Sequence, residues 1–181
     1  MQYILFLLFL IGCGTETIQT NSHSLLDKQI PEKNWGEFSD YVDDFVSNAK
    51  VYGKDQYIRL DTLKVITVVD KLDSVDKEAD CRRFCYSDDG TLAYSQIQVT
   101  QKSIDLFFGE PTFRYLMFHE LAHCLLGAQH NDTKNSLMYP VIPEFEENNI
   151  VGGVIKDYFT GLSSLSLAAS NSCTSDPAVK K

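Results

Sequence analysis

Three of the four histidines in the sequence lie close together, in the segment FHELAHCLLGAQH at residues 118–130. His119 and His123 are four residues apart, so on an α-helix their imidazoles lie on one face, one turn apart. Two neutral imidazoles in this arrangement supply half of a tetrahedral zinc site. We expect Glu120, the residue after the first histidine, at the open side of the metal, where a water would bind. Zinc lowers the pKa of such a water toward about 7, so a carboxylate there can accept its proton as a general base.

The histidine–glutamate pattern also occurs by chance on amphipathic helices, so the residues that follow it matter. Gly127 is predicted to end the helix, and His130 then returns as a candidate third ligand. Asp132 is the alternative third ligand; we favour His130, because an imidazole suits zinc better. Further along, SLMYP at residues 136–140 is predicted to place Met138 in a tight turn followed by proline.

These two segments together resemble the metzincin metallopeptidases, whose pattern HExxHxxGxxH is followed by a methionine turn of the form S-x-M. Within that group the matrixins often have LMYP. The sequence is also similar to small bacterial metallopeptidases with FHELGHC, many of which carry a lipobox. The resemblance implies an α+β fold: a single zincin-like domain with a twisted mixed sheet, a long N-terminal helix and an active-site helix.

The resemblance also implies a role for each residue that matches the pattern. One catalytic zinc ion would be held by three histidines: His119, His123 and His130. Glu120 would be the general base, and Met138 would pack beneath the metal as a hydrophobic floor. Tyr139 follows Met138 directly, so it does not match the zinc-binding tyrosine of the family, which lies two residues after the methionine. We therefore expect Tyr139 and Pro140 to form part of the substrate pocket.

Two departures from the family pattern concern the active-site helix. Ala122 stands where the family usually has glycine, which is a mild change on a helix. In addition, one extra residue lies between His123 and Gly127, so His130 follows seven residues after His123 rather than six. An added helical residue rotates the helix exit by about 100°. We therefore expect a longer helix, with a turn after Gly127 that differs from the standard one.

The first residues of the sequence predict export. MQYILFLLFLIGCG contains an apolar run at residues 4–11, which is shorter than the roughly 20 residues of a membrane-spanning helix and fits an export signal. LIGC at residues 10–13 resembles the lipobox of bacterial lipoproteins, although no Lys or Arg precedes the apolar run. We expect a lipoprotein signal peptide at residues 1–12 and a lipidated Cys13 that attaches the protein to a membrane of a bacterial cell envelope. The alternative is a secretory signal with a coincidental cysteine.

Export favours disulfide bonds among the remaining cysteines, because thiols oxidise outside the cytosol. These are Cys81, Cys85, Cys124 and Cys173. Four cysteines allow three connectivities, and the sequence alone does not choose between them. The similarity to relatives with one loop cysteine and FHELGHC indicates Cys85–Cys124, which leaves Cys81–Cys173. Because Cys124 points away from the metal-facing stripe of the helix, we expect a disulfide there rather than a fourth metal ligand.

Polarity and periodicity divide the chain further. A polar tether is predicted at residues 13–34, one metallopeptidase domain at residues 35–162, and a Ser-rich tail at residues 163–181. The last helix of the domain is predicted at residues 145–159, where two glycines weaken the pattern. The sequence contains no internal repeat and no Gly-rich phosphate loop.

The elements that precede the metal-binding motif are also predictable. Apolar residues recur at helical spacing over residues 35–49, which predicts an amphipathic helix packed on a sheet. The β-branched segment at residues 63–70 predicts a buried strand, and alternation at residues 92–101 predicts a strand with one face toward solvent. The charged segment between them, residues 71–90, is predicted to be a long loop. Pro111 is predicted to open the helix that carries the histidines.

Composition limits the function further. A net charge of −9 disfavours nucleic acid and anionic membrane surfaces as partners, since both attract clustered Lys and Arg.

We expect a monomeric, zinc-dependent endopeptidase that hydrolyses a peptide or protein substrate, with the substrate strand paired to residues 94–101. The alternative is a non-catalytic zinc-binding lipoprotein with a structural or adhesive role, which would have no need of Glu120.

Overall fold

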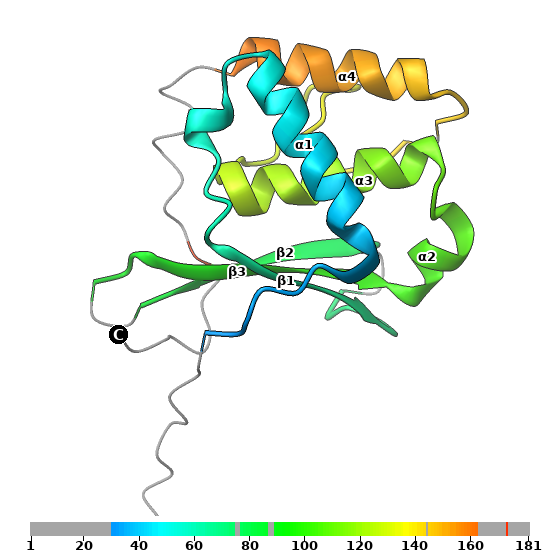
Figure 1. The fold of residues 1–181 in the computed structure, drawn as a ribbon. Coiled ribbons are helices and arrows are strands. Elements are labelled where there is room, and N and C mark those ends of the chain that lie inside the picture. Colours follow the sequence, from blue (N-terminus) through cyan, green and yellow to red (C-terminus); the bar gives the residue numbers. More distant parts are fainter. Residues whose placement is uncertain (1–29, 75–76, 87–88, 144, 163–172, 174–181) are drawn as a thin grey trace, which may run out of the picture.

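The computed structural model describes most of the chain after its first segment: residues 30–74, 77–86, 89–143, 145–162 and Cys173. Within these residues, four α-helices and one three-stranded mixed sheet confirm the predicted α+β class (Figure 1). The predicted signal peptide and Cys13 lie outside the described residues, as do most of the tether and all of the tail except Cys173. None of the described helices combines the length and the apolar character that crossing a membrane requires.

The sheet has the order β1-β3-β2. β1 (Leu63–Val69) runs parallel to β3 (Leu92–Thr100), and β2 (Ala79–Cys85) runs antiparallel to it. β3 is therefore the central strand and is buried along most of its length, so the prediction that one of its faces meets solvent is wrong. β1 is only partly buried, because it lies at an edge of the described sheet.

β2 lies inside the segment that was predicted to be a loop. Its alternate residues Ala79, Cys81 and Arg83 are buried, whereas Asp80 and Arg82 between them are partly exposed. This is the two-residue period of a strand with one face toward the interior. The charged residues conceal that period, because a strand at the edge of a sheet tolerates more polar side chains than a central one. The prediction of a long loop at residues 71–90 is therefore wrong over β2.

Helix α3 (Pro111–Leu121) lies between the sheet and the other large helices (Figure 1). Every residue of α3 except Arg114 is buried, and Pro111 occupies its first turn, as predicted. The short helix α2 (Gln101–Phe107), which was not predicted, connects β3 to α3 and begins where the Thr100 side chain accepts a hydrogen bond from the Ser103 amide. Because α3 is enclosed on several sides, the residues of its last turn are held in fixed positions.

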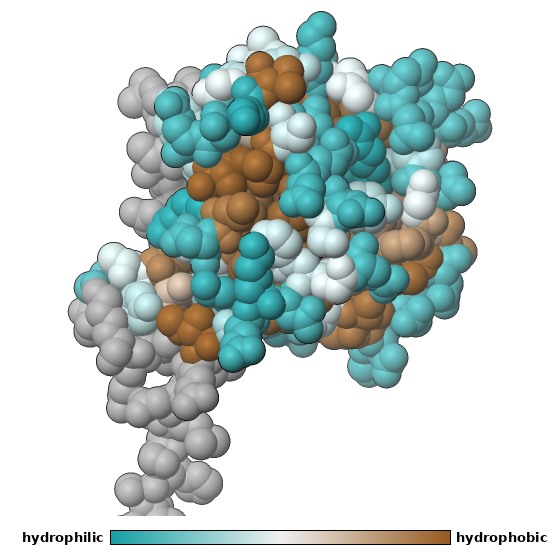
Figure 2. Space-filling model, in the orientation of Figure 1, coloured by the Kyte–Doolittle hydropathy of each residue, from teal (hydrophilic) through white to brown (hydrophobic). Residues whose placement is uncertain are grey.

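Helices α1 (Ser39–Val51) and α4 (Asn148–Gly161) cover α3 on the side away from the sheet (Figure 1). The Phe45 ring of α1 lies 5.2 Å, between centroids, from both Phe118 of α3 and Phe159 of α4. The helical period predicted for α1 is confirmed, but α1 packs chiefly on these helices rather than on the sheet. Hydrophilic residues predominate on the face seen in Figure 2, with hydrophobic residues showing between them.

Two disulfide bonds are present, as predicted, but their pairing differs from the prediction. Cys81 is bonded to Cys124 with a Cα–Cα distance of 5.6 Å, and Cys85 to Cys173 with 5.8 Å. The predicted pairing assumed that Cys81 and Cys85 lie in a loop. In β2, however, Cys81 lies on the interior face beside the metal-binding motif, and Cys85 lies at the end of the strand, where it meets Cys173.

Candidate metal centre

The helix that carries His119 and His123 changes from α-helical to π-helical geometry between these two residues. After α3 the chain forms a single π-helical turn, η3 (Ala122–Leu126), which includes His123. A π-helical turn holds one more residue than an α-helical turn, so an inserted residue can be taken up within a single turn. It therefore accommodates the extra residue between His123 and Gly127, and the expected longer α-helix with a rotated exit is wrong.

Gly127 ends this turn, as predicted, in the left-handed conformation with φ of 66°. Its amide donates to the His123 carbonyl at 3.1 Å, and the Ala128 amide donates to the Ala122 carbonyl at 3.1 Å. This conformation is one that glycine adopts without steric cost, and it reverses the chain direction. The reversal brings His130 back over the helix.

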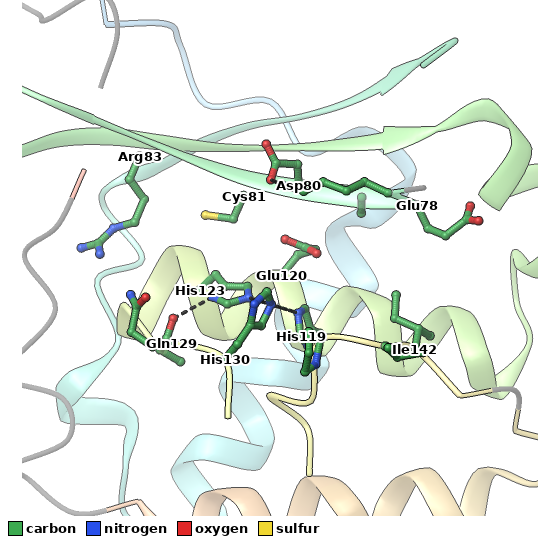
Figure 3. A pocket seen from close by; sticks show the side chains of 15 residues that line it. Glu78, Asp80, Cys81, Arg83, His119, Glu120, His123, Gln129, His130 and Ile142 are labelled. Carbon is green, nitrogen blue, oxygen red and sulfur yellow. Dashed lines mark hydrogen bonds and ion pairs between the residues drawn. The ribbon is translucent and has the colours of Figure 1, made fainter. Parts of the chain in front are cut away.

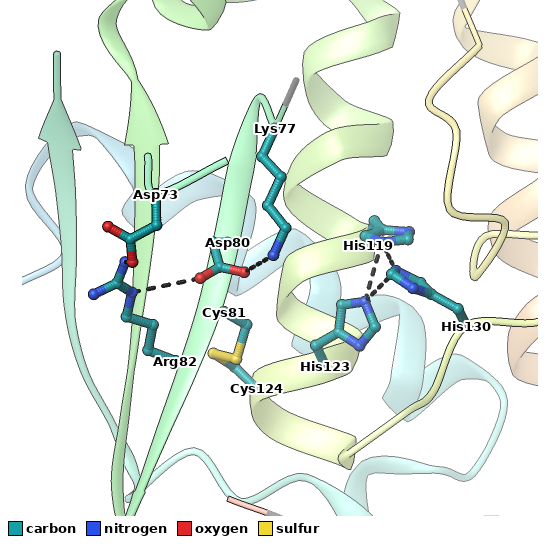
Figure 4. Close-up of polar contacts among 9 residues, drawn as sticks. All are labelled: Asp73, Lys77, Asp80, Cys81, Arg82, His119, His123, Cys124 and His130. Atoms are coloured by element: carbon teal, nitrogen blue, oxygen red, sulfur yellow. Dashed lines mark hydrogen bonds and ion pairs between the residues drawn. A yellow bond between two sulfur atoms is a disulfide. The ribbon is translucent and has the colours of Figure 1, made fainter. Parts of the chain in front are cut away.

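The Nε2 atoms of three histidines converge in the described residues (Figure 4). Each of the three pairwise Nε2–Nε2 distances among His119, His123 and His130 is 3.1 Å. A triangle with sides of this length leaves a point about 2.0–2.1 Å from all three nitrogens, which is the Zn–N distance of protein sites. Asp132, the alternative third ligand, is exposed and does not belong to this group. The donor set therefore fits a metal ion such as zinc.

Backbone carbonyls fix the tautomers of two of these rings. The Nδ1 atom of His119 lies 2.6 Å from the Leu137 carbonyl oxygen, and that of His123 lies 2.7 Å from the Ala128 carbonyl oxygen. A carbonyl oxygen only accepts, so both Nδ1 atoms carry the proton, and both Nε2 atoms of the neutral rings present lone pairs. Lone pairs that face one another at 3.1 Å repel unless a cation lies between them.

Desolvation favours the neutral form of these rings. Desolvation lowers the pKa of His119 to about 3 and that of His123 to about 4. The pKa of His130 is also lowered, first by desolvation and then by the nearby positive charge of Lys77. Metal ions bind the deprotonated imidazole, so all three rings are in the form that coordinates metal at neutral pH.

The turn that contains Met138 fixes the position of the carbonyl group that contacts His119. The Tyr139 amide donates to the Ser136 carbonyl at 3.0 Å, and the Tyr115 hydroxyl donates to the same carbonyl at 2.7 Å. These contacts hold the intervening Leu137 carbonyl against His119. Met138 itself is 2% exposed and belongs to the hydrophobic core, and its place beneath a metal stays a prediction.

A cleft of about 760 Å³ opens over the three histidines (Figure 3). One wall comes from residues 77–81 and Arg83 at β2, and the opposite wall comes from residues 140–142. Of the two residues expected at a substrate pocket, Pro140 lines this cleft and Tyr139 does not.

Glu120 lies between the histidines and β2, at the floor of this cleft (Figure 3). Its side chain is buried, and its carboxylate accepts a hydrogen bond from the Cys81 amide. Desolvation, with a smaller effect of the Asp80 charge, raises its pKa to about 8, although the Cys81 amide opposes the shift. A cation bound at the histidines would favour the carboxylate form, which is the form a general base requires.

Several groups that build this site leave no signal in the sequence. The carbonyls of Leu137 and Ala128 and the amide of Cys81 are backbone groups, which every residue carries. Their positions depend on the turn geometry and on β2, neither of which the side-chain pattern reveals.

The chain was compared with protein-family profiles, with curated proteins and with solved structures, and none of the three comparisons gave a match. The fold and the site themselves define the class: an α+β protein with three histidines at metal-binding distance, compatible with a zincin-like site.

Proposed function

We propose that the protein is a zinc-dependent endopeptidase of the metzincin type. The single observation that carries this proposal is the position of Glu120, a buried carboxylate beside three converging imidazole nitrogens in one open cleft. A purely structural zinc site usually closes with a fourth protein ligand and needs no such base. Among the described residues, no further His, Cys, Asp or Glu side chain joins the three histidines.

Each residue of the site has a separate role in the proposed hydrolysis. Zinc held by the three histidines would act as a Lewis acid on the substrate carbonyl and acidify a water. Glu120 takes a proton from the attacking water and delivers it to the departing amine. The Cys81 amide holds the Glu120 carboxylate in place for both transfers. Burial of Glu120 strengthens the electrostatic interactions of its carboxylate, because the surrounding protein screens charge less than water does.

The substrate is proposed to be a peptide or protein segment in extended form. β3 is paired on both sides in the described sheet, so the expected pairing of substrate with residues 94–101 is wrong. β2, in contrast, is an edge strand of that sheet and forms one wall of the cleft. An edge strand offers backbone groups to which an extended peptide can add. We therefore place the substrate strand along β2.

Cleavage of a broad peptide library by the purified, zinc-loaded protein tests this proposal. Mass spectrometry of the products should reveal new amino termini at internal positions of the peptides, as an endopeptidase produces. Cleavage should stop when a chelator removes the metal. Tight zinc binding with no cleavage of any peptide would instead favour a non-catalytic zinc-binding lipoprotein.

Attachment to a bacterial envelope through Cys13 is proposed from the lipobox alone, because Cys13 lies outside the described residues. Several acyl chains on one cysteine anchor a protein stably, where a single chain does not. Cys13→Ser should therefore move the protein from the membrane fraction to the soluble fraction of fractionated cells. Membrane association that survives this change would contradict lipidation as the anchor.

A further inference from the structure

A disulfide connects the strand beside the cleft to the turn that carries a candidate metal ligand. Cys124 directly follows His123 in η3, and its partner Cys81 lies in the middle of β2 (Figure 4). Cys124 is fully buried and Cys81 is 8% exposed, so the bond lies within the protein. It therefore joins β2, which forms one wall of the cleft, covalently to the turn that carries His123.

The same cysteine of β2 also contacts Glu120. While the Cys81 side chain is bonded to Cys124, the Cys81 amide donates to the Glu120 carboxylate. Glu120 and Cys124 are four residues apart, so they lie about one turn apart along α3 and η3. The covalent bond and the hydrogen bond thus attach one residue of β2 to two adjacent turns of the helix.

Ala79 and Cys81 of β2 pack in the same hydrophobic core as α3 and η3, and the disulfide adds a covalent contact to this packing. In the described sheet β2 has a strand neighbour on one side only, so the ladder to β3 does not by itself set its distance from the helix. On the helix side, the π-helical turn departs from regular α-helical hydrogen bonding where Cys124 lies. The disulfide is the covalent contact that bridges these two segments.

We infer that the Cys81–Cys124 disulfide is a positioning element for the general base: it holds the β2 backbone at the distance that orients the Glu120 carboxylate over the histidines. This inference rests on the proposed peptidase function. It assigns to the bond a role in the reaction beyond its contribution to stability. A misplacement of about 1 Å in an active site can cost 10²-fold in rate, so loosening β2 should affect turnover.

The second disulfide provides a matched control on the same strand. Cys85 also belongs to β2, but neither Cys85 nor its partner Cys173 lines the cleft. Both bonds close long segments of chain, of 43 and 88 residues, so removal of either one should lower the melting temperature. Only the first should alter the geometry of Glu120.

The test compares the double variants Cys81→Ala/Cys124→Ala and Cys85→Ala/Cys173→Ala, each zinc-loaded and assayed below its melting temperature. We expect the first to lower kcat per bound zinc by about 10–100-fold with little change in KM, and the second to leave kcat within about twofold. In a Glu120→Gln background, removal of Cys81–Cys124 should lower kcat no further, because the positioned group is already absent. Equal losses of kcat for the two double variants, or an undiminished loss in the Glu120→Gln background, would overturn the inference.

A second measurement does not depend on cleavage. In the metal-free protein, hydrogen exchange of the backbone amide at position 81 should be slow, because that amide donates to Glu120. The exchange should become fast in Glu120→Ala and in Cys81→Ala/Cys124→Ala, and stay slow in Cys85→Ala/Cys173→Ala. Slow exchange that survives loss of Cys81–Cys124 would refute the inference even if the wild type proved to be a peptidase. The expected exchange pattern in a protein that cleaves nothing would support the positioning role while the proposed function fails.

Discussion

Glu120→Gln is expected to lower kcat for peptide cleavage by about 10²–10⁴ while zinc content and fold remain those of the wild type. The amide fills the same space, and its oxygen can still accept the hydrogen bond from the Cys81 amide. It has no basic oxygen to take a proton from water, however. Steady-state kinetics, metal analysis and circular dichroism on the same preparation separate these effects.

Glu110→Gln is the matched control for this substitution. Glu110 lies at the exposed start of the same helix, and its side chain makes no capping hydrogen bond. The control should retain the wild-type kcat. A Glu120→Gln protein as active as its parent would contradict the general-base role and assign the cleavage to a contaminant or to another site.

Replacement of His123 by alanine is expected to remove tight zinc binding, cleavage and zinc-dependent stabilisation together. The substitution takes away one of three convergent nitrogens and also leaves the Ala128 carbonyl without its imidazole donor. A ligand that binds only the folded state stabilises it by about 2.7 kcal/mol at a concentration 100 times its Kd. Zinc should therefore raise the melting temperature of the wild type but not that of His123→Ala.

Two comparisons sharpen this prediction. His130→Ala should behave like His123→Ala, because both Nε2 atoms belong to the same triangle. Asp132→Ala should respond to zinc as the wild type does, because Asp132 is exposed and outside that triangle. If Asp132→Ala lost the zinc response and His130→Ala kept it, Asp132 rather than His130 would be the third ligand.

The convergence of the histidines is predictable from the sequence because side-chain identity and helical spacing together determine their direction. His119 and His123 recur at an interval of four, and His130 follows a glycine whose left-handed conformation ends the helix. The helical period of α1 is predictable from the sequence for the same reason, because its buried residues Val42, Phe45 and Ala49 are apolar and regularly spaced.

β2 and the disulfide pairing are harder to predict, because their determinants are spread along the chain. An edge strand whose partly exposed residues include Asp80 and Arg82 has the composition of a loop. Once β2 is assigned to a loop, nothing distinguishes Cys81 from Cys85 as the partner of Cys124. The π-helical turn is likewise hidden, since an extra residue in a helix can lengthen it or be accommodated within one turn.

Stoichiometric zinc titration of the metal-free protein, with cleavage of one identified peptide followed at each addition, tests the central claim most directly. If the three histidines hold a single catalytic ion, the cleavage rate should rise linearly to one equivalent of zinc and then remain constant. The same titration of Glu120→Gln should show the same binding curve with almost no cleavage. Zinc that binds tightly at one equivalent without producing any cleavage in the wild type would contradict the claim that this centre is catalytic.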